Sequence, residues 1–262
     1  MRPGGDWRRI YAVGGMTFRS FFAYPWDMVI AFFTQPVAFF SYACFLLAVG
    51  GTTDWPMERL LAYYVMGWLL RMLLQPGLEH AVSDRVLSGE LAVDLTRPLG
   101  LAPLFLAMAA GRLTARALAY GLPGILLVFL VGGVAYLQPA SAWLPFAALA
   151  LNAVFLQVVF SLLLGWTAFY FSINAQIIWV TDMLIRLAGG LVVPVAFLPA
   201  QAAAGLKCLP FYYFYGAPLA YWANGGSWQT DWLVGLAWGM LLMTSGRMLL
   251  AGGLKRLAIN GG

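Results

Sequence analysis

Long apolar runs constrain this chain more than any other feature of its sequence. Residues 28–49 carry no charged side chain, and similar runs recur along the rest of the chain. A helix needs about 20 consecutive apolar residues to cross a bilayer. The chain is 62% hydrophobic and 10% charged, whereas a soluble domain has about 25% charged residues. These features predict an all-α polytopic membrane protein. They exclude a soluble β-fold and an outer-membrane barrel, whose segments are short and alternating.

Hydropathy predicts six transmembrane helices in a domain that covers residues 27–262. Their approximate ranges are 27–49, 57–78, 101–131, 143–165, 177–197 and 228–251. The third run is too long for one straight helix, so we expect its first part at the membrane interface. Pro123 is expected to kink it.

Two further segments of the chain are too polar or too broken to span. Residues 1–26 are basic and aromatic, which predicts an amphipathic helix in the cytoplasmic interface. Residues 198–226 are rich in proline, glycine and tyrosine. They predict short re-entrant helices on the outer side, covered by protein.

The longest polar segment, residues 79–100, separates the second predicted span from the third. It holds four of the ten acidic residues and the only histidine, His80. Apolar residues recur in it at helical spacing, which predicts an amphipathic helix. These residues are Val82, Val86, Leu87 and Leu91. Ser83 is expected to cap this helix and Gly89 to interrupt or end it. A helix of this kind between two spans indicates a docking surface.

The distribution of basic residues predicts the orientation. If both termini are cytoplasmic, the inner side receives most of the basic residues, and the outer side receives only Arg59 and Lys207. This asymmetry follows the positive-inside rule and places residues 79–100 in the cytoplasm. The net charge of +5 therefore indicates orientation and lipid headgroup contacts, and we expect no nucleic-acid partner.

The sequence contains no recognisable nucleotide-binding, catalytic or metal-binding motif. Neither lysine lies in a GxxxxGK[ST] loop, and no serine lies in a GxSxG turn. One histidine and the two scattered cysteines, Cys44 and Cys208, provide no metal-ligand pattern. We therefore expect the chain not to be an enzyme and to bind no cofactor or metal itself.

Three ionisable residues fall in or near the bilayer. Asp182 and Arg186 are four residues apart, so they share a helix face and are expected to pair. Arg71 lies in the second predicted span. Intramembrane charges are costly and often functional. Two interpretations stay open: contact with a substrate, and the favoured one, an interfacial ion pair with Arg71 snorkelling to the surface.

A cluster of tyrosines in the predicted outer segment also has two interpretations. Tyr212, Tyr213 and Tyr215 fit a belt of aromatic residues at the level of the headgroups. They also fit the lining of an outer exit for a flat or cationic compound, through cation–π contacts.

Three stretches of the chain match patterns of a known family. The first is VLSGELAVDLTRPLG, with Gly-Glu-Leu at 89–91 followed by Leu95 and the Arg-Pro pair 97–98. The second is VVPVAFLPAQAAAGLKCLPFYYFYGAPLAYW, with Leu-Pro-Phe at 209–211, and the third is the basic tail GLKRLAINGG. In this order they resemble type-2 ABC transporter permeases, the six-span family described as "ABC-2 family transporter protein". Residues 257–259 make the tail more apolar than the family pattern.

The resemblance implies an assembly and a set of coupling residues. Two permeases would associate with two ABC ATPase subunits, which would bind ATP and Mg²⁺, and with membrane lipids. The second permease would be a copy or a paralogue, with the heterodimer slightly favoured. Residues 79–100 would form the coupling helix that contacts the ATPase. The implied coupling residues are Ser83, Asp84, Val86, Leu87, Gly89, Glu90, Leu91, Leu95, Arg97 and Pro98.

The favoured function is therefore that of the permease subunit of an ATP-driven exporter. It would sit in a bacterial inner membrane and move a hydrophobic, amphipathic or cationic substrate outward. The alternative is an ATP-independent secondary transporter or channel that uses Asp182 and Arg186. A lipid-modifying membrane enzyme is a third hypothesis, which lacks a catalytic constellation.

Overall fold

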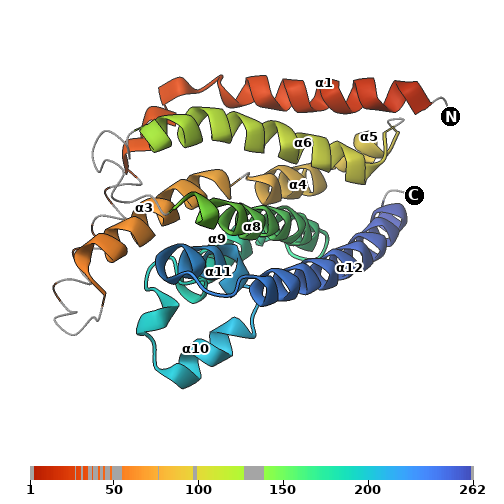
Figure 1. Cartoon of the computed structure of the whole chain (residues 1–262). Helices are drawn as coiled ribbons and strands as arrows, with labels where there is room; N and C mark the ends of the chain where they lie inside the picture. The colour runs from red at the N-terminus through yellow and green to blue at the C-terminus, as the bar shows by residue number, and fades with distance from the viewer. Residues whose placement is uncertain are drawn as a thin grey trace.

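The computed structural model describes most of the 262-residue chain. It covers residues 3–26, 55–75, 77–96, 99–126 and 139–260, with residues 28–30, 32–34, 37, 41, 44 and 48 of the first predicted span. Across these residues the regular structure is helical, which confirms the all-α prediction (Figure 1). Most of the first predicted span lies outside the described residues.

Three helical stretches in the described part of the chain are long and apolar enough to cross a membrane. They cover Leu101–Leu126, Ser141–Phe169 and Gln229–Arg256, and they correspond to the third, fourth and sixth predicted spans. The elements that form them are α6 (Leu101–Arg116) with η1 (Ala117–Gly121), α8 (Ala140–Trp166) with η3 (Thr167–Phe169), and α12 (Gln229–Asn260).

The expected irregularity near Pro123 takes a specific form. The segment η1 is a single π-helical turn that ends two residues before this proline. Proline has no N–H to donate to the carbonyl four residues earlier, and π turns accommodate such a break in the hydrogen-bond ladder. The helix therefore continues past the proline to Leu126.

The second and fifth predicted spans are occupied by shorter helices than expected. The helix α3 (Met57–Leu73) has 17 residues and α9 (Asn174–Ala188) has 15. At about 1.5 Å per residue these rise about 25 and 22 Å, less than the roughly 30 Å of a hydrocarbon core. The helix α9 does not reach residue 197, because Gly190 has a positive φ of 78° and Pro194 follows. The total of six spans stays a prediction.

Two short helices occupy the segment predicted as re-entrant. They are α10 (Ala200–Lys207) and α11 (Tyr212–Asn224), preceded by the turn η4 (Val195–Phe197). Ten of the 13 residues of α11 are buried, so α11 is a core helix and not a surface loop. The position of both helices relative to a membrane stays a prediction.

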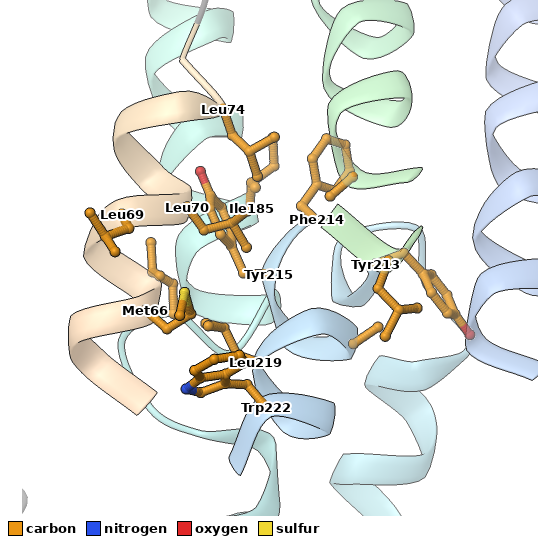
Figure 2. Close-up of a cluster of buried hydrophobic side chains, with 14 of the residues drawn as sticks. Met66, Leu69, Leu70, Leu74, Ile185, Tyr213, Phe214, Tyr215, Leu219 and Trp222 are labelled. Atoms are coloured by element: carbon orange, nitrogen blue, oxygen red, sulfur yellow. The ribbon is translucent and has the colours of Figure 1, made fainter. Parts of the chain in front are cut away.

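The main apolar core forms where α3, α8 and α9 surround α11. Figure 2 shows side chains of α3 facing those of α11, among them Met66, Leu70, Tyr215, Leu219 and Trp222. Gly216 lets α11 lie close to the end of α9, because a Cβ there would come within 3.0 Å of the carbonyl oxygen of Gly189 and would collide with the ring of Tyr212. This core fixes α11 between the helices that carry the ionisable residues described below.

A second apolar cluster joins the polar segment to the ends of the long helices. It includes residues of α4 (Leu78–Leu87) and α5 (Glu90–Thr96), together with residues of α6, α8 and α12. Its fully buried members include Leu78, Val82, Leu91 and Phe105. In Figure 1, α4, α5 and both termini lie toward the same side of the molecule.

The N-terminal helix α1 (Pro3–Phe21) lies lengthwise along α6 (Figure 1). Their backbones approach closely at two glycines, because a Cβ at Gly111 would overlap the carbonyl oxygen of Gly14. Small residues permit such close helix contacts in membrane proteins. Elsewhere α1 exposes two aromatic side chains, Trp7 and Tyr11, which are 65% and 77% exposed.

We expect Gly111→Leu to force α1 away from α6 and to lower the free energy of unfolding by about 2 kcal/mol, the usual cost of overpacking. The matched control is Gly15→Ala, since a Cβ at Gly15 has no neighbour within 4 Å. That control should equal or exceed the wild type in stability, because alanine favours a helix over glycine. Equilibrium unfolding in mixed micelles, followed by tryptophan fluorescence, measures both. Equal stabilities for the two variants would contradict the close contact.

Candidate functional site

The polar segment folds as two helices joined by a tight turn. Gly89 follows α4 with a positive φ of 79°, and α5 begins at the next residue. This confirms that Gly89 ends the first helix. The prediction that Ser83 caps α4 is wrong, because Ser83 lies in the middle of the helix and the N-cap is Gly77.

A buried asparagine, which the sequence analysis missed, holds α4 in place. Asn174 is fully buried at the start of α9, and its Nδ2 donates hydrogen bonds to the Oγ of Ser83 at 2.8 Å and to the carbonyl of Leu164 at 3.3 Å. The hydroxyl of Thr167 donates to its Oδ1. Asn174 therefore joins α4, the end of α8 and the start of α9. The sequence feature that could have pointed to Asn174 is its place in a short polar stretch between two apolar runs.

Further contacts fix both ends of α4. A Cβ at Gly165 in α8 would collide with the side chain of Val82, so the two helices meet there without a gap. The guanidinium of Arg112 in α6 donates to the carbonyl of Gly77, the N-cap of α4. Arg85 contacts Asp94 at 3.0 Å and ties α5 to α4. The pair α4–α5 is thus attached to α6, α8 and α9.

The predicted coupling residues divide between two faces. The buried ones, Ser83, Val86 and Leu91, hold the segment against the bundle. The exposed ones are Asp84, Leu87, Gly89, Glu90 and Leu95. Arg97 and Pro98 lie outside the described residues.

The exposed face of α4–α5 combines apolar and acidic side chains. Leu87, Val93 and Leu95 are 52%, 59% and 48% exposed, and Asp84 and Glu90 are exposed as well. Val93 was not among the predicted residues. We name these five residues the α4–α5 face. Exposed apolar side chains with polar residues around them are typical of protein contact surfaces.

The three ionisable residues of the predicted spans meet in one cluster. Arg71 in the last turn of α3 donates two hydrogen bonds to the carboxylate of Asp182 in α9, at 2.9 and 3.1 Å. Arg186 contacts the same carboxylate at 3.0 Å, which confirms the expected pairing within α9. Arg71 is only 5% exposed. It does not snorkel to the surface, so that part of the interpretation is wrong: a carboxylate partner inside the bundle satisfies the guanidinium instead.

Two neutral groups complete this cluster. The hydroxyl of Tyr215 in α11 accepts a hydrogen bond from Arg71 at 3.3 Å. The amide oxygen of Gln75, oriented to face the guanidinium, accepts another. We name Arg71, Gln75, Asp182, Arg186 and Tyr215 the charge cluster. It joins α3, α9 and α11.

Two helices, α3 and α9, connect the charge cluster to α4. Only four residues of the chain separate the end of α3 at Leu73 from the start of α4 at Leu78. The helix α9 contacts α4 through its first residue, Asn174, and carries Asp182 two turns later. A displacement of α4 would therefore act on α9 and α3 through hydrogen bonds and a continuous backbone.

The other two tyrosines of the predicted cluster are not joined to the charge cluster. Figure 2 shows Tyr213 and Tyr215 pointing away from each other. The hydroxyl of Tyr213 donates to the carbonyl of Lys207 at 2.8 Å, and the ammonium of Lys207 lies 5.8 Å from the centre of the Tyr212 ring. All three tyrosines are buried. A role in an outer exit stays a prediction.

Comparison with known proteins identifies the family. The family model described as "ABC-2 family transporter protein" matches residues 32–261, well over half of the chain. Comparisons with curated proteins and with solved structures give no match. Members of this family are the multi-pass membrane components of transporters that associate with ABC ATPases. The chain belongs to the ABC-2 family and is a type-2 ABC transporter permease.

Proposed function

We propose that this permease is the membrane subunit of an ATP-driven exporter and that the ATPase docks on the α4–α5 face. The observation that carries the proposal is the division of this segment into two faces. One face is tied to the bundle by Asn174 and apolar packing, and the other exposes Leu87, Val93 and Leu95. An exposed apolar surface on an otherwise firmly seated segment is suited to a partner protein.

The contacts of α4 supply a route for the coupling. Closure of the ATPase dimer on ATP and Mg²⁺ would push α4, and Asn174 would carry the movement to α9. The short chain connection between Leu73 and Leu78 would carry it to α3, whose last turn holds Arg71 of the charge cluster. Packed helices with two arrangements transmit such movements. The substrate would be hydrophobic, amphipathic or cationic and would move outward.

The assembly would contain two ATPases and two permeases, the second permease being a copy or a paralogue. Its place would be a bacterial inner membrane, with both termini in the cytoplasm. The position of both termini on the side of α4–α5 in Figure 1 supports this orientation. Arg85, Lys255 and Arg256 add positive charge near the same elements, as the positive-inside rule requires of a cytoplasmic side.

The α4–α5 face offers a direct test. We expect Leu87→Asp and Val93→Asp each to lower the amount of ATPase that co-purifies from native membranes by tenfold or more. A carboxylate desolvated in an apolar contact costs several kcal/mol, and about 1.4 kcal/mol already gives tenfold. Quantitative mass spectrometry of the co-purified proteins measures the ratio.

The matched control for this test is Val93→Ile, which keeps the apolar surface and should retain the ATPase. Leu91→Arg is not suitable, because Leu91 is fully buried and the change would disrupt the segment itself. Wild-type recovery of an ATPase with both aspartate variants would exclude docking on this face.

The alternative function, an ATP-independent transporter that uses Asp182 and Arg186, receives less support. Two guanidinium groups already contact the carboxylate of Asp182. Such pairing stabilises the ionised form and makes this residue a poor carrier of protons. Transport that depends on a proton gradient and continues without ATP would favour the alternative.

A further inference from the structure

A groove with a cavity volume of about 260 Å³ lies between α6, α8 and α12, and none of the residues that line it belongs to the α4–α5 face or the charge cluster. Its walls are almost entirely apolar. They include Phe105 and Leu106 from α6, Phe155 and Leu162 from α8, and Leu242 and Leu250 from α12. Among the residues that the structure describes, Arg247 in α12 is the only charged one that lines it. The groove therefore combines a surface for hydrocarbon with one cation.

A glycine keeps this groove open. A Cβ at Gly246 would meet only the Cβ of Leu163, at 3.9 Å, which is an ordinary contact. The other glycines of α12 differ, because a Cβ at Gly239 would collide with the ring of Phe155, and one at Gly253 with the ring of Phe169. Those glycines permit helix packing. Gly246 leaves space that no side chain of the described chain fills.

Arg247 lies within a helix that is long enough to cross a membrane. Its side chain is exposed, and none of the residues that line the groove is acidic. A guanidinium in a spanning helix is costly unless it reaches an anionic partner. Two further positive charges follow towards the C-terminal end of α12. Lys255 is exposed, and the guanidinium of Arg256 lies 4.3 Å from the centre of the Tyr170 ring. The negative charge that balances Arg247 must therefore come from outside these residues.

We infer that this groove binds an anionic phospholipid, with an acyl chain along the apolar walls and the phosphate on Arg247. Arginine binds phosphate oxygens through two parallel hydrogen bonds, which gives the contact both strength and direction. Its long aliphatic stem allows the guanidinium to rise from the groove to the headgroups. Basic pockets between spanning helices are suited to anionic headgroups. The inference stands without the proposed function, because it involves neither ATP nor the α4–α5 face.

Native mass spectrometry of the full chain, purified in mild detergent, tests the inference. The protein is titrated with phosphatidylglycerol and with phosphatidylcholine of the same acyl chains. We expect phosphatidylglycerol to bind about fivefold more tightly, the effect of one basic residue near an anionic headgroup. Arg247→Gln should abolish this preference, and Arg247→Lys should restore much of it. Gly246→Leu should fill the groove and lower the binding of both lipids.

The matched control is Lys255→Gln, which removes one exposed positive charge from the same helix outside the groove. It should leave the preference intact. Equal losses for Arg247→Gln and Lys255→Gln would assign the preference to diffuse surface charge and overturn the inference. Equal binding of the two lipids by the wild type would overturn it as well, whether or not the variants fold. So would a purified dimer in which cross-links from Gly246→Cys place a second chain over the groove.

Discussion

Asp182→Ala is expected to lower the free energy of unfolding by about 3 kcal/mol, the lower end of the range for breaking a buried ion pair. The change leaves Arg71, which is 5% exposed, without its carboxylate partner. The hydroxyl of Tyr215 and the amide of Gln75 still accept hydrogen bonds from it, but neither carries a counter-charge. The carboxylate itself is 31% exposed, which keeps the expected cost at the lower end. Equilibrium unfolding in mixed micelles measures the difference.

Two companion variants separate the ion pair from general damage. Arg186→Gln removes a half-exposed contact to the same carboxylate and should cost less than about 1 kcal/mol. The double variant Arg71→Met/Asp182→Leu should recover much of the stability, because it leaves no uncompensated buried charge. If Asp182→Ala is no more destabilising than Arg186→Gln, the pair between α3 and α9 is not an important contact.

Asn174→Ala is expected to destabilise the chain by about 2 to 3 kcal/mol, since it removes three buried hydrogen bonds worth about 1 kcal/mol each. These bonds join Asn174 to the hydroxyls of Ser83 and Thr167 and to the carbonyl of Leu164. Thr167 and Leu164 keep the hydrogen bond that joins them to each other. Under the proposed function the variant should also bind the ATPase normally but export less substrate per ATP hydrolysed, because α4 loses its link to α9. Unfolding in mixed micelles and transport in reconstituted vesicles measure the two effects.

The same polar stretch offers a control for Asn174. Gln176 is exposed two residues later, so Gln176→Ala should leave both stability and coupling at the level of the wild type. Ser83→Ala removes one partner of Asn174 and should cost about 1 kcal/mol. An Asn174→Ala variant with unchanged transport per ATP would show that α4 acts on the bundle by another route.

Local chemistry explains which sequence predictions were confirmed. Gly89 ends α4 because a positive φ is easily reached only by glycine. The pairing of Asp182 with Arg186 follows from a spacing of four residues on one helix. Both outcomes depend on residues that are close in the chain, and no distant contact changes them.

Two predictions failed because they ignored distant partners, and a third because it ignored a local break in the backbone. Ser83 was expected to cap a helix, as serine often does, but its hydroxyl accepts from Asn174, which is 91 residues away. Arg71 was expected to snorkel, but its partner Asp182 is 111 residues away. The helix α9 was expected to continue to residue 197, because hydropathy measures composition and does not register the backbone break at Gly190.

Hydropathy along the chain is enough to establish an α-helical membrane protein, because the free energy of transfer into lipid adds up residue by residue. The amphipathic pattern of residues 79–100 is likewise legible without a structure, since it depends only on spacing along a helix. Three other features become visible only when the helices are packed: which side chains of α4–α5 are exposed, which carboxylate Arg71 contacts, and where a groove stays open beside Arg247. These features depend on which helices become neighbours, and a hydrogen bond or an ion pair forms only when packing brings its two groups within about 3 Å.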